Sequence, residues 1–417
     1  MIRLAVPVYV ELVTAVVAVG LIDLLWVSGL GEGAIAAVTV GTTVEYLAYG
    51  LFLAVPTGVT VLVGRRDGRA PVAPVIRAGW ALWAVLSAVI TVPGVLLREP
   101  LAALFTDEWR LTAGFFLVSL GGLPVFFAQT VVDGILKGRG DTRRPMRHAI
   151  ICNVLVVALD PLFVYGLGMG VQGAALATVA ARLVTLAFAL VTSRHLITER
   201  GPGGRAAWEV VRTGLPMSGD FLARSAVGMA LVDLVAGFGT RELAGYGIGQ
   251  KIMLAGVMVF YALRQAAMIR TARSEPAGSP LLLGLGAGAA VALALNVVAA
   301  PVAALFTADP GPAVSFLRWM TLYLVPFGGL IAVGGVLQAS GRGGRLLAAT
   351  LAGFAVQVPL AYGLSAYAGV TGVWLAMAAG AAVSLAGALA PRGGDPGSAR
   401  GRAPRSTRTA ADRPSGP

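Results

Sequence analysis

The chain has 417 residues, of which 57% are hydrophobic and only 12% are charged, and its mean hydropathy is +0.81. Soluble domains are about 45–50% apolar and about 25% charged, so this composition excludes a water-soluble enzyme. The net charge of +12 would favour a nucleic-acid partner only if the basic residues covered a soluble surface, and we therefore expect no such partner. One cysteine and two histidines exclude both a disulfide framework and a Cys/His metal site.

Apolar runs long enough to cross a bilayer, about 20 residues each, recur along the whole chain. Twelve such spans lie near residues 4–28, 34–63, 75–97, 111–136, 146–166, 171–192, 210–238, 243–269, 280–305, 312–339, 346–366 and 370–390. The predicted fold class is an all-α integral membrane protein with 12 transmembrane helices. Its predicted parts are an N-terminal six-helix bundle (1–195), a cytoplasmic connector (196–209), a C-terminal six-helix bundle (210–391) and a disordered basic tail (392–417).

The two sets of six spans are related in sequence. The segment Pro100–Thr106 recurs as Pro301–Thr307, and Val171–Gly173 recurs as Val370–Gly372. Because each set has an even number of spans, both halves enter the membrane in the same orientation, as a parallel repeat about an axis along the membrane normal. Most Lys and Arg residues fall in loops on the side of the N-terminus, so the positive-inside rule predicts cytoplasmic N- and C-termini in a bacterial cell membrane.

Seven acids fall within the predicted spans: Glu11, Asp23, Glu45, Asp133, Asp160, Asp220 and Asp233. A charged side chain at a helix centre costs about 2.5–3.5 kcal/mol, so most of these acids must face a wet cavity, find a partner or lie near an interface. Five of them belong to the first half, which predicts a specialised polar site there.

Asp160 is the strongest single candidate. Asn153 precedes it by nearly two helical turns, so both side chains are expected on one face of the fifth span. Pro161 lacks an N–H group and clashes with the carbonyl of Val157. A freed carbonyl beside a carboxylate and an amide suits a hard cation or a buried proton. The alternative is a proline kink near the outer end of the span, with Asp160 exposed to water.

Glu45 is followed by Tyr46 and, one helical turn on, by Tyr49. A carboxylate beside tyrosine rings can line a cavity that accepts cations through charge and cation–π contacts, and we take the three residues as a candidate substrate cavity. The alternative is a Glu45 side chain that is hydrogen-bonded between helices.

The remaining acids are more ambiguous. Asp23 is either part of a site or an acid hydrated near an interface, and Asp133 is expected to pair with an arginine of the 137–147 loop. Glu11 and Asp220 occupy equivalent positions in the two halves, four residues after a proline. Their symmetry favours a shared packing or hinge role.

Soluble-enzyme motifs are absent. The chain has no Gly-x-x-x-x-Gly-Lys-Ser/Thr sequence for ATP hydrolysis, and no His-Glu-x-x-His, Gly-x-Ser-x-Gly or paired-cysteine motif. We therefore expect neither enzymatic activity nor a cofactor, so any transport would be driven by an ion gradient or by a separate subunit.

With these residues laid out, the chain resembles the multidrug and toxin extrusion (MATE) family. The similarity is carried by Leu21–Val27, Ile135–Arg143, Leu159–Pro161 and Gly168–Thr178, and it extends in order over roughly residues 1–390. It implies a V-shaped pair of six-helix bundles that exports organic cations or other amphiphiles in exchange for H⁺ or Na⁺.

The match looks closer to the branch that includes DNA-damage-inducible protein F. That resemblance implies a cation-coupling site in the first half, made by an Asp on the first helix, an Asn and an Asp on the fifth, and a Thr on the sixth. Asp23, Asp160 and Thr178 stand at the matching positions. The position of the family's Asn holds Val156, and Asn153 is the nearest substitute. Loss of that amide favours H⁺ over Na⁺ as the coupling ion.

In the implied mechanism, ionised Asp23 and Asp160 hold a lipophilic cation, and protonation from outside releases it. The helices would repack around hinges at Pro7 and Pro161. The expected partners are a small amphiphilic substrate and the lipid bilayer, and the expected oligomeric state is a monomer.

Two other functions stay open. Arg182, Arg224 and Lys251 lie within spans and would suit a flippase for lipid-linked precursors of the same superfamily, whose cavities bind anionic headgroups. An integral-membrane transferase would require a loop-borne acidic metal motif such as Asp-Asp-x-x-Asp, which the chain lacks.

Overall fold

The computed structural model describes residues 1–106, 109–197, 206–276 and 278–390, and the regular structure in these ranges is helical. The N-terminal half contains α1 (Ile2–Leu12), a π-helical stretch (Val13–Ala18), α2 (Val19–Val27), a 3₁₀ turn (Ser28–Leu30), α3 (Glu32–Phe52), α4 (Ala54–Arg66), α5 (Ala73–Leu96), α6 (Arg98–Ala103), α7 (Trp109–Gly121), α8 (Leu123–Gly138), α9 (Arg143–Pro161), a second π-helical stretch (Leu162–Gly166) and α10 (Gly170–Ile197). The C-terminal half contains α11 (Ala206–Ala236), α12 (Thr240–Ala272), α13 (Pro280–Ala303), α14 (Gly311–Ala339), α15 (Gly343–Ala368) and α16 (Val370–Leu389).

Each of the 12 predicted spans coincides with a helical path. Ten helical stretches among the described residues are long and apolar enough to cross a membrane. The first span is divided by Val13–Ala18 into α1 and α2, which are each too short to cross alone. The seventh span corresponds to α11, whose apolar sequence is interrupted by ionisable residues that include Asp220 and Arg224.

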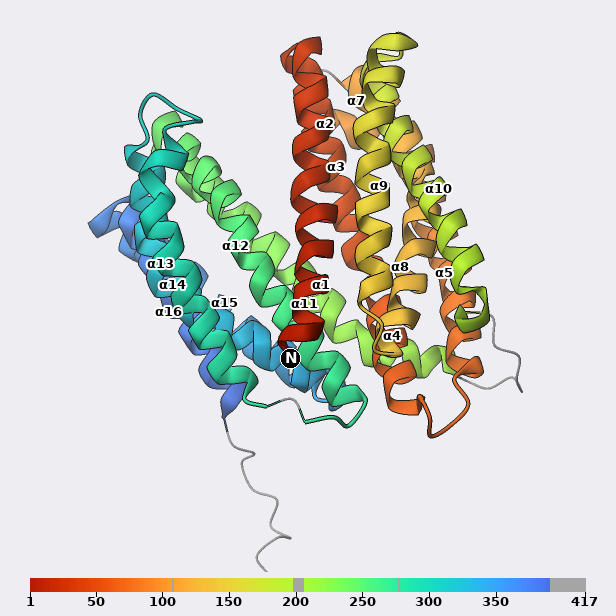
Figure 1. The fold of residues 1–417 in the computed structure, drawn as a ribbon. Coiled ribbons are helices and arrows are strands. Elements are labelled where there is room, and N and C mark those ends of the chain that lie inside the picture. The colour runs from red at the N-terminus through yellow and green to blue at the C-terminus, as the bar shows by residue number, and fades with distance from the viewer. Residues whose placement is uncertain (107–108, 198–205, 277, 391–417) are drawn as a thin grey trace, which may run out of the picture.

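The helices form two bundles, each with its own core (Figure 1). In the first core the rings of Phe52 and Phe127 stack with their centroids 4.2 Å apart. In the second, Tyr246 stacks on Trp374 at 5.3 Å. Helix α11 joins the bundles, because Val210 at its start packs in the first core whereas its later turns pack in the second.

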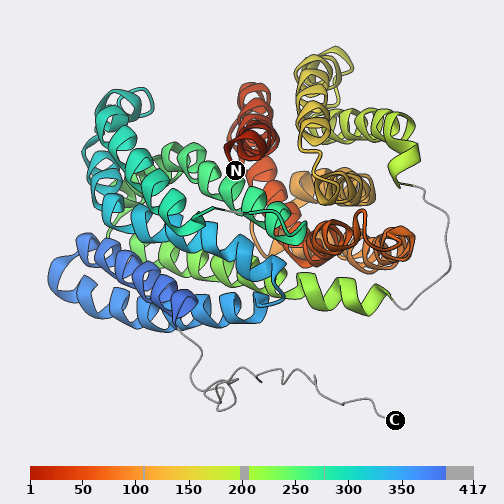
Figure 2. The same ribbon diagram turned by 60° about the horizontal axis from the view of Figure 1, so that its bottom comes forward.

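The two bundles approach one another at one end and diverge at the other, which gives the molecule the shape of a V (Figure 1). The N-terminus lies at the closed end, between the bundles in both views (Figure 2). Small residues permit the close approach of α4 and α11 there. A Cβ atom on Gly214 would overlap the Ala54 carbonyl, and one on Gly58 would overlap the Val210 carbonyl.

Polar contacts join the two halves at the closed end. Arg273 Nη1 lies 2.6 Å from Asp67 Oδ2, and Arg65 Nη2 donates to the Ala339 carbonyl at 2.7 Å. Arg69 Nη2 donates to the Arg273 carbonyl at 3.0 Å. We call these five residues the closed-end seam.

The helix bounds bear on the predicted parts of the chain. Helix α10 continues to Ile197 and α11 begins at Ala206, so helical structure enters the predicted connector 196–209 from both sides. The predicted tail 392–417 and residues 198–205 of the connector lie outside the described residues.

The α4–α11 crossing yields a test of stability. Gly214→Ala should destabilise the protein by about 1–3 kcal/mol, because the added methyl group forces two backbones apart. Gly228→Ala, on the same helix but with open space around its Cβ position, should be neutral or stabilising by up to about 1 kcal/mol, because alanine is the better helix former. The apparent melting temperature of the detergent-purified protein measures both. Equal melting temperatures for the two variants would contradict a tight crossing at Gly214.

Candidate functional site

A cavity of about 220 Å³ lies within the N-terminal bundle. Its wall is contributed by α1, the first π-helical stretch, α2, α3, α7, α8, α9 and α10. Six residues predicted as site residues line it: Asp23, Glu45, Tyr46, Tyr49, Asn153 and Thr178. These six side chains come from four helices, α2, α3, α9 and α10, and converge on one polar hollow.

Asp23 and Thr178 meet in this cavity. Thr178 Oγ1 donates to Asp23 Oδ1 at 3.5 Å, which is the long limit of a hydrogen bond. Asp23 also lies close enough to Asp160 and Arg182 for their charges to interact. The structure therefore brings together the acids of the first and fifth spans that the family resemblance singles out.

Asp160 is fully buried at the end of α9, so the alternative of an acid exposed to water at a proline kink is wrong. Neither carboxylate oxygen of Asp160 has a hydrogen-bond partner among the described residues, and Asp160 is not among the residues that line the cavity. Asn153 donates from Nδ2 to the Ala149 carbonyl at 3.0 Å, while its Oδ1 is buried without a partner. Both halves of the predicted Asn153–Asp160 face thus keep acceptor oxygens that no protein donor satisfies.

Glu45 lines the cavity and is also paired. Arg182 Nη1 lies 3.3 Å from Glu45 Oε2, and the Arg182 guanidinium lies over the Phe126 ring, 4.5 Å from its centroid. Glu45 is therefore paired between helices, as the alternative interpretation states, and its role in a substrate cavity stays a prediction. The cation–π contact at this wall is made by the protein's own Arg182 on Phe126 and not on Tyr46 or Tyr49.

Asp133 pairs with a different partner from the one expected. His148 Nδ1 lies 2.9 Å from Asp133 Oδ1, and Gln129 Nε2 donates to the same oxygen at 3.0 Å. The expectation of an arginine from the 137–147 loop is wrong, because α9 directs His148 toward α8. His148 and Gln129 also line the cavity. Sequence reasoning missed both, although a histidine within an apolar run was a visible signal.

Glu11 belongs to a second buried pair at the edge of the cavity. Lys137 Nζ lies 2.6 Å from Glu11 Oε1, and both side chains are about one-tenth exposed. This pair ties α1 to α8. Its equivalent in the second half, Asp220, pairs with arginines, so the symmetric placement of the two acids corresponds to buried ion pairs in both halves.

The two predicted hinge prolines lie beside distorted helix segments. Pro7 is buried within α1, and the π-helical stretch Val13–Ala18 begins soon after it. Pro161 ends α9 and is followed directly by the π-helical stretch Leu162–Gly166. Such segments are common at functional sites, and the hinge role of both prolines stays a prediction.

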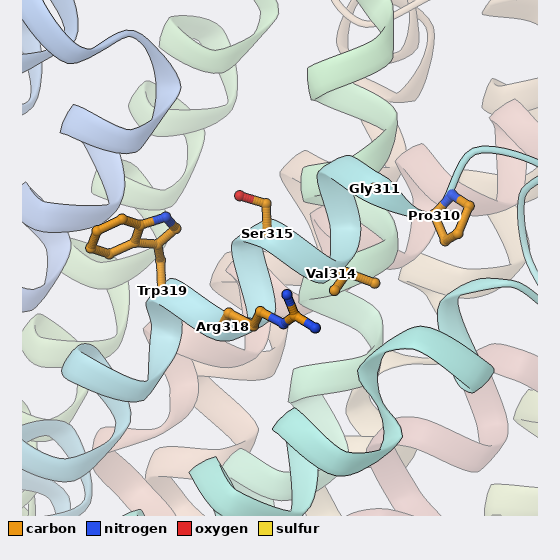
Figure 3. Close-up of a pocket in the computed structure, with 6 residues that line it drawn as sticks. All are labelled: Pro310, Gly311, Val314, Ser315, Arg318 and Trp319. Atoms are coloured by element: carbon orange, nitrogen blue, oxygen red, sulfur yellow. The ribbon is translucent and has the colours of Figure 1, made fainter.

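A separate hollow of about 430 Å³ lies at the start of α14 (Figure 3). Its six lining residues all come from one stretch of chain, Pro310–Trp319, and they include Arg318 but no acid and none of the predicted site residues. This hollow therefore lacks the groups needed for cation exchange.

The chain is similar to known membrane transporters. A protein-family model described as MatE matches residues 7–162 and 216–363. The FAD transporter of Shewanella oneidensis is 26% identical over 332 residues, which cover 73% of each chain. The DNA damage-inducible protein F of Escherichia coli is 33% identical, but only over 34% of this chain and 30% of its own length.

Solved structures agree with the observed architecture. A protein described as an outward-facing conformation of a multidrug resistance MATE family transporter superposes with a TM-score of 0.83, at 24% identity over 92% of both chains. The predicted fold class, 12 transmembrane helices in two bundles, is thereby confirmed.

The Glu11–Lys137 pair predicts a specific loss of stability. Lys137→Met should cost about 3–5 kcal/mol, because it leaves the Glu11 carboxylate buried without its cation. The double variant Glu11→Gln/Lys137→Met should recover much of that loss, because no charge is then left unpaired. Thermal unfolding of the purified variants measures the coupling.

Arg98→Gln provides the control, because the Arg98 and Glu99 side chains are 33% and 56% exposed and the loss of a pair that reaches water should change stability by less than about 1 kcal/mol. A double variant that is less stable than Lys137→Met alone would show that the two side chains do not act as an ion pair.

Proposed function

Because this chain belongs to the MatE family and is therefore a multi-pass membrane transporter, we propose that it is a secondary active antiporter. In this proposal it exports organic cations or other amphiphilic compounds in exchange for H⁺ or Na⁺. The transporter family also argues against the transferase alternative.

The observation that carries the proposal is the fully buried Asp160 carboxylate, which has no hydrogen-bond partner in the part of the chain that the structure describes. An isolated ionised carboxylate is unstable away from water, so it must either bind a proton or lie near a cation. Asp23 lies nearby and lines the cavity. Two carboxylates with so few fixed donors can alternate between a protonated state and an ionised state that attracts a cationic substrate.

We favour H⁺ over Na⁺ as the coupling ion. A hard cation needs several oxygen ligands held in a shell, and the family's asparagine one turn before Asp160 is replaced by Val156. The Asn153 amide could contribute Oδ1, since that atom is unpartnered. Protonation requires no such shell.

The V shape supports transport by alternating access. The closed end carries the N-terminus and the arginines of the seam, and the positive-inside rule would place that end in the cytoplasm. The bundles would then diverge toward the outside. Movement of one charge inward at 100 mV supplies about 2.3 kcal/mol, enough to sustain roughly a 40-fold gradient of a neutral substrate.

The cations that motivated the flippase alternative are differently placed. Arg182 is paired with Glu45 and Arg224 with Asp220, while Lys251 is exposed on α12. Only one of the three therefore lines the N-terminal cavity, and its charge is balanced there.

Transport by purified protein in proteoliposomes tests the proposal. With an imposed proton gradient, the wild type should accumulate ethidium and release protons when ethidium is added. Asp160→Asn and Asp23→Asn should each lower both signals at least tenfold, because the exchangeable carboxylate is lost. Asp233→Asn should have no effect, since Asp233 is an exposed acid of α11 outside the cavity.

A parallel experiment with an Na⁺ gradient identifies the coupling ion, and we expect no uptake from Na⁺ alone. Undiminished ethidium-driven proton release in Asp160→Asn would overturn the assignment of Asp160. If ethidium uptake is unchanged after both ion gradients have been dissipated, antiport itself would be overturned.

A further inference from the structure

A buried cluster of charges occupies the C-terminal bundle, at the junction of α11, α12 and α15 (Figure 1). Asp220 accepts hydrogen bonds from Arg224 Nη2 at 3.0 Å, from Arg264 Nη1 at 3.3 Å and from Thr350 Oγ1 at 2.8 Å. Arg224 also donates to Thr350 at 3.2 Å. Asp220 and Arg264 are each only 2% exposed, so these two side chains are shielded from water, whereas the Arg224 side chain is 18% exposed.

The cluster has one more positive charge than negative. Two guanidinium groups face a single carboxylate, whereas the equivalent acid of the first half, Glu11, faces the single cation Lys137. Arg264 Nε and Nη2 are buried and have no acceptor among the described residues. A buried arginine with unused donors is costly unless an anion completes its hydrogen bonds.

Arg224 borders two hollows, and Arg264 borders one of them. A hollow of about 230 Å³ is lined by polar and aromatic residues of α11 and α12, among them Asp220, Arg224, Tyr261 and Arg264. A second hollow of about 210 Å³ shares Arg224 and Tyr261 with the first. Four more aromatic side chains line the second hollow: Tyr246, Tyr323, Phe327 and Phe354.

The first hollow lies against the N-terminal bundle. Phe221, which lines it, contacts the Tyr49 ring edge-on with centroids 6.3 Å apart. Tyr49 in turn lines the cavity that holds Asp23. The contact between Tyr49 and Phe221 therefore joins the lining of the N-terminal cavity to the lining of the first hollow.

We propose that Arg224 and Arg264 form a binding site for the phosphate or carboxylate of an amphiphilic anion, whose ring system lies among the neighbouring tyrosines and phenylalanines. Guanidinium groups match these anions in geometry and charge, since they donate parallel hydrogen bonds to two oxygens. When no anion is bound, Asp220 lowers the free-energy cost of burying the two guanidinium groups, because its carboxylate neutralises one of them. This proposal rests on the proposed antiport function where it extends the range of substrates to anionic compounds. Binding of the anion to the site can be tested without transport.

Riboflavin and riboflavin 5′-phosphate test this proposal, because they share one ring system and differ by a phosphate. Binding to the purified full-length protein is followed by quenching of flavin fluorescence. The phosphorylated form should bind at least tenfold more tightly to the wild type, and this preference should fall to less than threefold in Arg264→Gln and in Arg224→Gln. Asp220→Asn should strengthen the preference, because it removes the competing carboxylate. Where a substitution in this cluster impairs folding, the comparison of the two flavins on the wild type still tests the proposal.

Two arginine variants serve as controls. Arg318→Gln, in the surface hollow of Figure 3, should retain the preference. Equal binding of the two flavins by the wild type would overturn the proposal. So would a preference that survives both Arg224→Gln and Arg264→Gln, or one abolished by Arg182→Gln alone, which would place the anion in the N-terminal bundle.

The same anion chemistry is present in lipid headgroups, and nanodiscs separate the two sources. If phosphatidylglycerol occupies the site, flavin phosphate binding should be weaker in phosphatidylglycerol discs than in phosphatidylcholine discs, and Arg264→Gln should abolish the difference. That result would support the site with a lipid as occupant. Equal binding in both discs, with the phosphate preference intact, would support a soluble amphiphile. Failure of ethidium antiport with an intact flavin preference would count against the proposed function alone.

Discussion

The free energy needed to hold an ionised group away from water governs the arrangement of this protein. Four of the seven predicted span acids have a basic partner: Glu11 with Lys137, Glu45 with Arg182, Asp133 with His148, and Asp220 with Arg224 and Arg264. Each of these acids has at least one cation on a different helix, so compensation of charge also contributes to how the helices pack. Asp160 is the buried exception. Binding of a proton or cation lowers the free energy of a buried carboxylate most when no basic side chain already neutralises it. An acid of this kind is suited to ion coupling, whereas a paired acid has a structural role.

The backbone near Asp23 and Asp160 is also irregular. The π-helical stretch Val13–Ala18 leads into the helix that holds Asp23, and the stretch Leu162–Gly166 follows Asp160. The Tyr165 hydroxyl donates to the Trp26 carbonyl, so the two irregular helices are tied together beyond the acids. A π-helical segment leaves backbone groups less well satisfied than a regular helix does, and it can return to regular geometry at small cost. Neutralisation of the acids and a change in helix geometry can therefore be linked.

The fold was predictable because its determinants are local. Apolar length fixes the number of spans, and internal similarity fixes their division into two halves. The rotation of each helix about its own axis, which decides which neighbour a side chain faces, cannot be predicted from the local sequence, since it depends on packing against other helices. For this reason the predicted partner of Asp133 was wrong, and no local sequence pattern marked Arg264 as a residue that is 2% exposed beside Asp220. Repeat symmetry did indicate that Glu11 and Asp220 are equivalent, but it could not reveal how many cations each one faces.

Alternating access requires rigid bundles joined by contacts that can break, and the distribution of interactions meets this requirement. Each bundle encloses its own apolar core, and separating helices within a core would lose the close van der Waals packing that holds helices together in a bilayer. The closed-end seam is held in part by the Asp67–Arg273 pair, whose side chains are about one-quarter exposed. Ion pairs that reach water contribute only about 0–1 kcal/mol each, so the seam can open without disruption of either core. The close approach of α4 and α11 at Gly58 and Gly214 then provides a small-residue contact about which the bundles can pivot.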